Sequence, residues 1–271
     1  MKHISILGCG WLGLPFAERL TQKGYKVKGS TTSEEKLPII EQKGIQPFLI
    51  NLKNELSQPL MNDFLSSDIL LINIPPSRSQ EGGKSYMDQL KSLIPHLKQS
   101  SISKIIFIST TAAYASEGKV VTEKDEQRIT SPFSDIIWLD AEEIFTLEDK
   151  FDTTVVRFSG LIGGSYQPGK YFSGKEMKGA DEPVNMIHLT DCLNIIEGII
   201  ERNLWNETYN ASSDEHPSRR EFYTKACETA GTPAPIFIEG HLPYRIVNSD
   251  KIKKALDYHF VYPNPMDGLG I

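Results

Sequence analysis

Cysteine is scarce in this sequence, with only Cys9, Cys192 and Cys227 among 271 residues. No two of them have the CxxC spacing of zinc and redox sites, and three distant thiols do not form a disulfide framework. Thiols that remain reduced are typical of the cytoplasm. We therefore expect a cytoplasmic protein without a metal site.

Positively charged residues are also fewer than negatively charged ones: the sequence has 29 Lys and Arg against 35 Asp and Glu, which gives a net charge of -6. Nucleic acids and anionic membrane surfaces both require clustered cations. No apolar run approaches the roughly 18 residues that cross a bilayer. A signal-like apolar run is interrupted by Gly8 and Gly10. We expect neither a nucleic acid nor a membrane as partner.

What the sequence does contain is an alternation of short β-branched segments with longer amphipathic ones. Such alternation predicts an α/β fold, a Rossmann-type doubly wound parallel sheet. The expected strands are 3–7, 26–30, 45–51, 68–74, 104–109 and 153–158. The expected helices between them include 15–23, 85–99 and 134–148.

After Phe158 the pattern becomes loop-like, with six glycines in residues 159–185. A helix at 189–202 is expected to return to the sheet, and Ser218 with Glu221 has the pattern of a capping box. We therefore expect a Rossmann domain of 1–158 with 186–204, and a small C-terminal substrate-binding lobe of 159–185 and 205–271.

Residues Gly8, Gly10, Trp11, Leu12 and Gly13 follow the first expected strand and open a helix. In a dinucleotide fingerprint of this form, the first glycine permits the tight turn. The second lets the backbone approach a pyrophosphate, and the third allows close helix packing. A glycine turn that serves packing alone is the alternative.

The end of the second expected strand reads Ser30-Thr31-Thr32, where NAD-binding proteins usually place an acidic residue. Hydroxyls here can donate to a 2′-phosphate, and Lys36 adds a positive charge one helical turn further on. This favours NADP over NAD as cofactor. Alternatively, Thr32 and Glu35 form a capping box and leave Lys36 solvated, and both arrangements are compatible.

Several motifs together resemble the extended short-chain dehydrogenases/reductases, in the atypical epimerase/dehydratase-like branch. They are the glycine turn, "INL" at 50–52, "INIPP" at 72–76, "ISTTAAYA" at 108–115, "VVRFSGLIG" at 155–163, "NMIHLTD" at 185–191 and "YNASSDEHPSRREFY" at 209–223. The resemblance implies that Asn51 and Leu52 hold the adenine. It also implies that Ile74 and Pro75 line the nicotinamide side, unless Pro75 and Pro76 only end the strand.

The resemblance further implies that the Ser109-Thr110-Thr111 turn lies at the reacting end of the cofactor, with the Thr110 hydroxyl on the substrate oxygen. The family's proton donor is a Tyr four residues before a Lys, and both precede a Glu. With Glu142 as that Glu, the two places hold Ser134 and Trp138. With Glu143, they hold Asp135 and Leu139. The Tyr-Lys pair is absent in either case.

Candidate replacements for the missing acid are Tyr114, Tyr166, Tyr171 and His188, of which Tyr114 is the residue we assign beside Thr110. Each has a structural alternative. Tyr114 would pack under the turn, and His188 would be a buried residue before a helix that Thr190 or Asp191 caps. Arg157, on the sixth expected strand, lies beside the expected nicotinamide end, or alternatively forms a buried ion pair. Other candidates for the substrate lobe are Lys170, Lys175, Arg219, Arg220 and Asn248.

Two functions therefore remain open. The first is an NAD(P)-linked oxidoreductase or epimerase that acts on a small sugar-nucleotide or carbonyl substrate with a non-standard proton donor. The second is a non-catalytic NAD(P)-binding regulator or scaffold, for which the Tyr-Lys pair is unnecessary. In the resembled family, the helices that correspond to 85–99 and 134–148 commonly form a homodimer interface, so a homodimer is possible. Both stretches carry apolar stripes here, but packing against the core also requires one stripe per helix.

Overall fold

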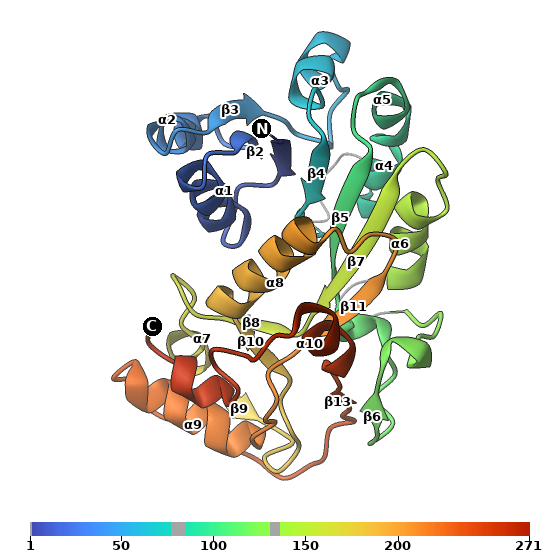
Figure 1. Ribbon diagram of the computed structural model, residues 1–271. Coiled ribbons are helices and arrows are strands. Elements are labelled where there is room, and N and C mark those ends of the chain that lie inside the picture. The colour runs from blue at the N-terminus through green and yellow to red at the C-terminus, as the bar shows by residue number, and fades with distance from the viewer. Residues whose placement is uncertain (1, 77–84, 131–135) are drawn as a thin grey trace. The chain divides into compact units, whose positions relative to one another are not determined.

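The computed structural model describes residues 2–76, 85–130 and 136–271 (Figure 1). A seven-stranded sheet has the order β11-β7-β5-β4-β1-β2-β3, and neighbouring strands among β1 to β5 pair in parallel. The expected doubly wound α/β class is confirmed. The strands are β1 (His3–Leu7), β2 (Lys26–Thr31), β3 (Gln46–Leu49), β4 (Ile69–Ile72), β5 (Lys104–Thr110), β7 (Asp152–Phe158) and β11 (Thr208–Ala211).

The order of these strands reverses next to β1, because β2 and β3 lie on one side of it and β4 and β5 on the other. In open α/β sheets, ligands bind outside the carboxyl ends of the strands at such a switch point. Strand β4 is buried throughout, as a strand covered on both faces should be. The carboxyl ends of β1 and β4 are therefore where a ligand is expected.

Helices connect the strands of this sheet. They are α1 (Gly13–Gln22), α2 (Leu37–Gln42), α3 (Gln58–Phe64), α4 (Tyr86–Lys91), α5 (Ile94–Gln99) and α6 (Trp138–Thr146), with a 3₁₀ turn at Glu34–Lys36. The single helix expected at 85–99 was wrong: it is two helices, α4 and α5. Pro95 lies in the first turn of α5, where its missing N–H is harmless, whereas it would break a continuous helix.

The chain divides into two compact units. The first comprises residues 1–109, 130–155 and 205–207. Its core includes Phe16 and Phe64, which are fully buried, and the Phe107 and Phe145 rings, whose centroids lie 5.3 Å apart. The second comprises 110–129, 156–204 and 208–271, so these units differ from the two domains expected above: the helix at 189–202 belongs to the second.

Three short parallel strand pairs lie in the second unit: β8 (Gly160–Ile162) with β10 (Met186–His188), β9 (Glu176–Met177) with β12 (Ile236–Phe237), and β6 (Val120–Val121) with β13 (Ile246–Val247). Its helices are α7 (Pro168–Phe172), α8 (Leu189–Arg202), α9 (Arg219–Thr229) and α10 (Asp250–Leu256). It also has 3₁₀ turns at Thr111–Ala113, Glu123–Asp125 and Pro265–Gly268.

The expected start of α9 is confirmed, because the hydroxyl of Ser218 accepts from the Glu221 backbone while the Glu221 carboxylate accepts from the Ser218 backbone. This reciprocal pair satisfies two donors that the first helical turn would otherwise leave without partners. Phe222 and Tyr223 then pack with Ile162, Met177 and Val184 in one apolar cluster.

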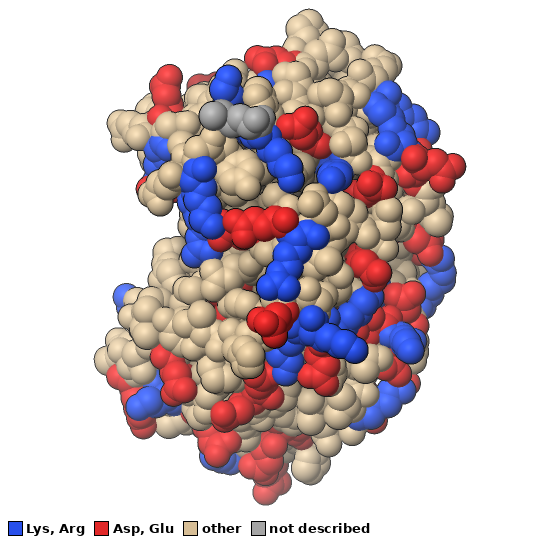
Figure 2. Space-filling model, in the orientation of Figure 1, with Lys and Arg blue, Asp and Glu red and all other residues tan. Residues whose placement is uncertain are grey.

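Charged side chains are mixed on the surface: on the face in Figure 2, lysines and arginines are interspersed with aspartates and glutamates. In the described part of the chain, no helix combines the length and apolar character needed to cross a membrane.

Candidate functional site

The turn after β1 is bound tightly to the segment after β4. Gly8 has a φ of +105°, and a Cβ there would lie 2.4 Å from the backbone oxygen of Asn73. The Asn73 side-chain amide donates to the Gly8 oxygen at 3.2 Å. Only glycine combines this backbone conformation with this close approach. Asn73 was not among the predicted site residues, although it lies inside the quoted "INIPP".

The other two glycines of the turn differ in their surroundings. A Cβ on Gly13 would lie 2.1 Å from the Gly8 oxygen, so this glycine is required for α1 to pack against the turn. Among the described residues, a Cβ on Gly10 would meet no atom within 4 Å. The protein's own packing therefore explains Gly8 and Gly13, and it leaves Gly10 facing open space.

Helix α1 begins at this open space without a side-chain cap, and its first turn has no acidic residue. The Leu14 amide in this turn donates to the Gly10 oxygen at 3.1 Å and Pro15 has no N–H, while the helix dipole favours an anion beside the preceding amides. Leu12 is buried in the core, whereas Trp11 is half-buried. Such a helix start, following a glycine, is suited to bind a phosphate group.

Ser30, at the end of β2, supports the same turn. Its hydroxyl accepts from the Gly8 amide at 3.0 Å, and its backbone oxygen accepts from the Cys9 amide at 2.7 Å. Ser30 is buried, with 2% of its surface exposed. The structure thus gives it a role in positioning the glycine turn, one that sequence reasoning missed.

The residues after Ser30 are more exposed to solvent than Ser30 itself. The Thr31 hydroxyl accepts from the Ser33 amide at 3.2 Å, while Thr32 and Lys36 are exposed. The capping box of Thr32 and Glu35, the alternative considered for this segment, is not formed: Ser33 precedes the 3₁₀ turn, and no side chain caps it. The extended backbone at Ser33 shifts the start of the turn by one residue.

The residues expected to hold the adenine and the nicotinamide side lie after β3 and β4. The Asn51 side-chain oxygen accepts from the Lys53 amide at 3.1 Å and so closes a local turn, while Leu52 is buried. Ile74 is half-buried, Pro75 is exposed, and the Ile74 oxygen accepts from the Tyr86 hydroxyl at 3.1 Å.

Ser109, near the end of β5, contacts helix α6. Its hydroxyl donates to the Glu142 carboxylate at 2.6 Å, and both side chains are buried. Glu142 therefore faces the sheet, whereas Glu143 is half-buried. With Glu142 as the reference, Trp138 occupies the place of the family's lysine. Ser134 and Asp135, at the place of the tyrosine, lie outside the described residues.

Thr110 and Tyr114 belong to the second unit. The Thr110 hydroxyl accepts from the Ala112 amide and caps a 3₁₀ turn. The Tyr114 hydroxyl donates to the Asn210 side chain and accepts from Arg157, each at 2.7 Å. Burial raises the pKa of Tyr114 to about 12. This geometry favours the structural alternative for Tyr114.

Arg157 has the structural role that was the alternative to catalysis. It is 1% exposed, and it pairs with the Glu126 carboxylate at 2.7 Å. Its guanidinium also lies over the Tyr114 ring at 5.2 Å from the centroid. A buried arginine is retained only when such partners compensate for its desolvation.

His188 caps helix α8, because its Nδ1 accepts from the Thr190 amide at 3.1 Å. The expectation that Thr190 or Asp191 caps this helix was wrong. Asp191 is fully buried and accepts from the Val261 amide at 2.7 Å. Burial lowers the pKa of His188, which favours the neutral ring that accepts this bond.

The candidate residues of the C-terminal lobe lie mainly on its surface. Lys175 stacks on Tyr171 at 3.6 Å from the ring centroid, and Arg219 and Arg220 lie over Tyr223 and Phe237. Lys170, Tyr166 and Tyr171 are exposed. Asn248 exchanges two hydrogen bonds with Asp250 at the start of α10.

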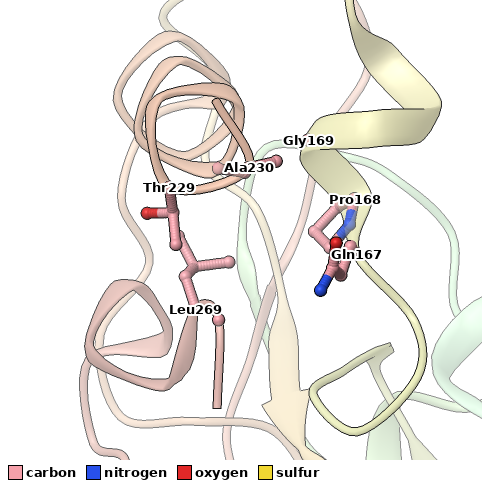
Figure 3. A pocket seen from close by; sticks show the side chains of 8 residues that line it. Gln167, Pro168, Gly169, Thr229, Ala230 and Leu269 are labelled. Atoms are coloured by element: carbon pink, nitrogen blue, oxygen red, sulfur yellow. The ribbon is translucent and has the colours of Figure 1, made fainter. Parts of the chain in front are cut away.

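A small hollow between α7 and α9 is too small for a substrate (Figure 3). Its volume is about 30 Å³, which holds about one water molecule. Residues that line it are Gln167, Pro168, Gly169, Ala226, Thr229, Ala230, Leu269 and Gly270. Within the described ranges, no three His, Cys, Asp or Glu side chains gather to hold a metal ion.

The contrast between the glycines predicts opposite effects on stability. Gly13→Ala places a methyl group against the Gly8 oxygen and should lower the free energy of unfolding by about 1–3 kcal/mol or more. Gly10→Ala should leave it unchanged or raise it by up to about 1 kcal/mol, because fewer unfolded conformations remain. Chemical denaturation of both variants measures this difference, and equal losses would contradict it.

Comparison with known proteins supports the fold. No protein-family profile matches the chain. Protein YeeZ of Escherichia coli K12 is 27% identical, with 98% of each chain covered. UDP-glucose 4-epimerase of Thermotoga maritima, solved with UDP-glucose, is 17% identical, covers 98% of this chain and 96% of its own, and has a TM-score of 0.80.

UDP-glucuronic acid 4-epimerase of Bacillus cereus, solved with UDP-glucuronic acid and NAD, has a TM-score of 0.79 at 17% identity. The alignment covers 98% of this chain and 96% of that one. These similarities span nearly the whole length of the chain and agree with the order of its sheet. The chain therefore shares the fold of these two epimerases over nearly its whole length.

Proposed function

We propose that this protein binds a nicotinamide dinucleotide at the β1–α1 turn and acts on a small sugar-nucleotide or carbonyl compound. The observation that carries the proposal is the difference in surroundings among the three glycines. Gly8 and Gly13 are required by contacts within the chain, whereas Gly10 faces open space at an uncapped helix start. A pyrophosphate fits that space and that electrostatic environment.

The residues around the turn would each have a distinct task. Gly10, Trp11, Leu12 and Gly13 would present backbone amides to the pyrophosphate, while Ser30 and Asn73 hold the turn in place. Asn51 and Leu52 would contact the adenine, and Ile74 and Pro75 the nicotinamide side, with Ser109 at the end of β5. When bound, a nicotinamide group supplies the capacity to accept or donate a hydride.

The similarity to epimerases supports the substrate class. The T. maritima and B. cereus structures hold UDP-glucose and UDP-glucuronic acid, and this chain shares their fold over nearly its full length. Fold alone does not define chemistry. We therefore propose a small carbonyl or sugar-nucleotide compound as the substrate, with the Thr110 hydroxyl near the reacting oxygen.

The state of Tyr114 favours a second candidate function, a nucleotide-binding regulator without turnover. Its hydroxyl is engaged by Asn210 and Arg157, and its raised pKa makes it a weak acid. Without a placed acid, carbonyl reduction loses about 10²- to 10⁴-fold in rate. Binding with no turnover across a broad carbonyl and sugar-nucleotide screen would favour the regulator over the enzyme.

Calorimetry with NAD and NADP tests the binding proposal. We expect both to bind the wild-type protein and Gly10→Ala to bind the preferred nucleotide at least about tenfold more weakly, since a methyl group would occupy the path of the pyrophosphate. As a control, Gly198→Ala adds the same methyl group on helix α8 in the second unit, where the Leu256 side chain must give way, and should leave nucleotide affinity unchanged. No binding of either nucleotide at millimolar concentration would refute the proposal.

We further propose that NADP is preferred, because β2 ends in Ser30-Thr31 and Thr32 and Lys36 are exposed beyond it. Glu34 and Glu35 precede Lys36 and weaken its positive field. Lys36→Ala should still lower NADP affinity roughly fivefold, the equivalent of about 1 kcal/mol for an exposed charge contact. NAD affinity should not change, nor should either affinity in Lys91→Ala. Equal loss for both nucleotides would contradict the preference.

A further inference from the structure

The indole N–H of Trp138, in the first unit, is a buried hydrogen-bond donor that the packing of this unit does not explain. Trp138, the first residue of α6, is 8% exposed, and its buried indole Nε1 has no hydrogen-bond partner in the described part of the chain. Leaving such a donor unsatisfied costs about 1–3 kcal/mol. A polar atom of this kind needs an explanation.

The contacts of the Trp138 ring do not require its N–H group. The ring packs edge-on against Tyr86, with centroids 5.8 Å apart and planes at 65°. A phenylalanine at this position would make the same kind of contact without the unsatisfied donor. The indole nitrogen is therefore unexplained by the ring packing.

Two chains of contacts place Trp138 near the carboxyl edge of the sheet. Tyr86, which its ring touches, donates to the Ile74 oxygen just beyond the end of β4. Glu142, one helical turn after Trp138 on α6, accepts from Ser109 near the end of β5. Residues four apart lie on the same helix face. Trp138 and Glu142 therefore both face this edge.

We propose that the indole N–H of Trp138 donates a hydrogen bond to an oxygen on the nicotinamide half of the bound dinucleotide. This rests on the function proposed above and adds a binding residue to it. The donor is neutral, so it suits a hydroxyl or carbonyl oxygen and provides no charge. Since the nitrogen is already covered in the structure described, binding involves a local displacement of the side chains that cover it.

The role is one of binding and orientation only. A neutral indole N–H cannot lower the pKa of a neighbouring acid as an ammonium group does. Trp138 would thus hold the nicotinamide end in place without helping a proton transfer, which agrees with the absence of the family's Tyr-Lys pair.

Calorimetry on Trp138→Phe is the first test, with NAD, NADP and, as a probe of the adenine half, ADP. We expect the preferred dinucleotide to bind about 3- to 10-fold more weakly, the effect of losing one neutral hydrogen bond. ADP should bind as it does to the wild type. Trp205→Phe is the matched control, because Trp205 stacks on Lys104 at the opposite, amino end of β5.

NMR of the ¹⁵N-labelled indole groups is the second test, and it needs no altered Trp138. The chain has three tryptophans, so Trp11→Phe and Trp205→Phe assign the Trp138 resonance by elimination. We expect its proton to shift downfield with the dinucleotide and not with ADP. An unchanged Trp138 resonance, or undiminished dinucleotide affinity in Trp138→Phe, overturns this inference. A wild-type protein that binds no dinucleotide refutes the proposed function itself.

Discussion

The close approach of the β1–α1 turn to the segment after β4 is the constraint on which the candidate site depends. A backbone oxygen of Asn73 occupies the space where a side chain on Gly8 would begin, and the Asn73 amide holds the Gly8 oxygen. Ser30 holds the Gly8 amide from the other side. The turn is thereby fixed between two neighbours of β1 in the sheet. A rigid turn of this kind presents the start of α1 in one orientation, as preorganised binding requires.

Beyond this turn, the residues proposed to bind the dinucleotide and the candidate proton donors lie in different units. The parts that would hold a dinucleotide are assembled within one unit, from the ends of β1, β2, β3, β4 and β5. Two of the four candidate proton donors, Tyr114 and His188, are engaged in hydrogen bonds within the second unit. Tyr114 and Arg157 bond to each other inside the second unit, and the His188 Nδ1 accepts a backbone hydrogen bond. The other two candidates, Tyr166 and Tyr171, are exposed on the second unit.

The sequence predicted the sheet well because its signals are local. The β-branched runs and the fingerprint each depend on a few adjacent residues, and helix 189–202 and the Ser218 cap were also predicted correctly. Strand β11, only four residues long, was not predicted. The break at Pro95 was misjudged because the apolar pattern continues through it. Local composition could not reveal that His188 caps α8, since histidine is not a common capping residue.

The interior of the site was harder to predict, because it depends on contacts between distant parts of the sequence. Ser30 was assigned to the cofactor, and the structure bonds its hydroxyl to Gly8, 22 residues earlier. Glu142 and Glu143 could not be distinguished in the sequence, and the bond from Ser109 selects Glu142. That choice then places Trp138 where a lysine was sought.

Backbone hydrogen–deuterium exchange of the wild-type protein, with and without a saturating nicotinamide dinucleotide, tests the central claim most directly. If the start of α1 binds the pyrophosphate, the amides of residues 10–13 should exchange more slowly in the complex, because each gains an acceptor or is covered. The amides of α9, whose cap is already complete, should not change. Unaltered exchange at residues 10–13 while the nucleotide is bound would contradict the account.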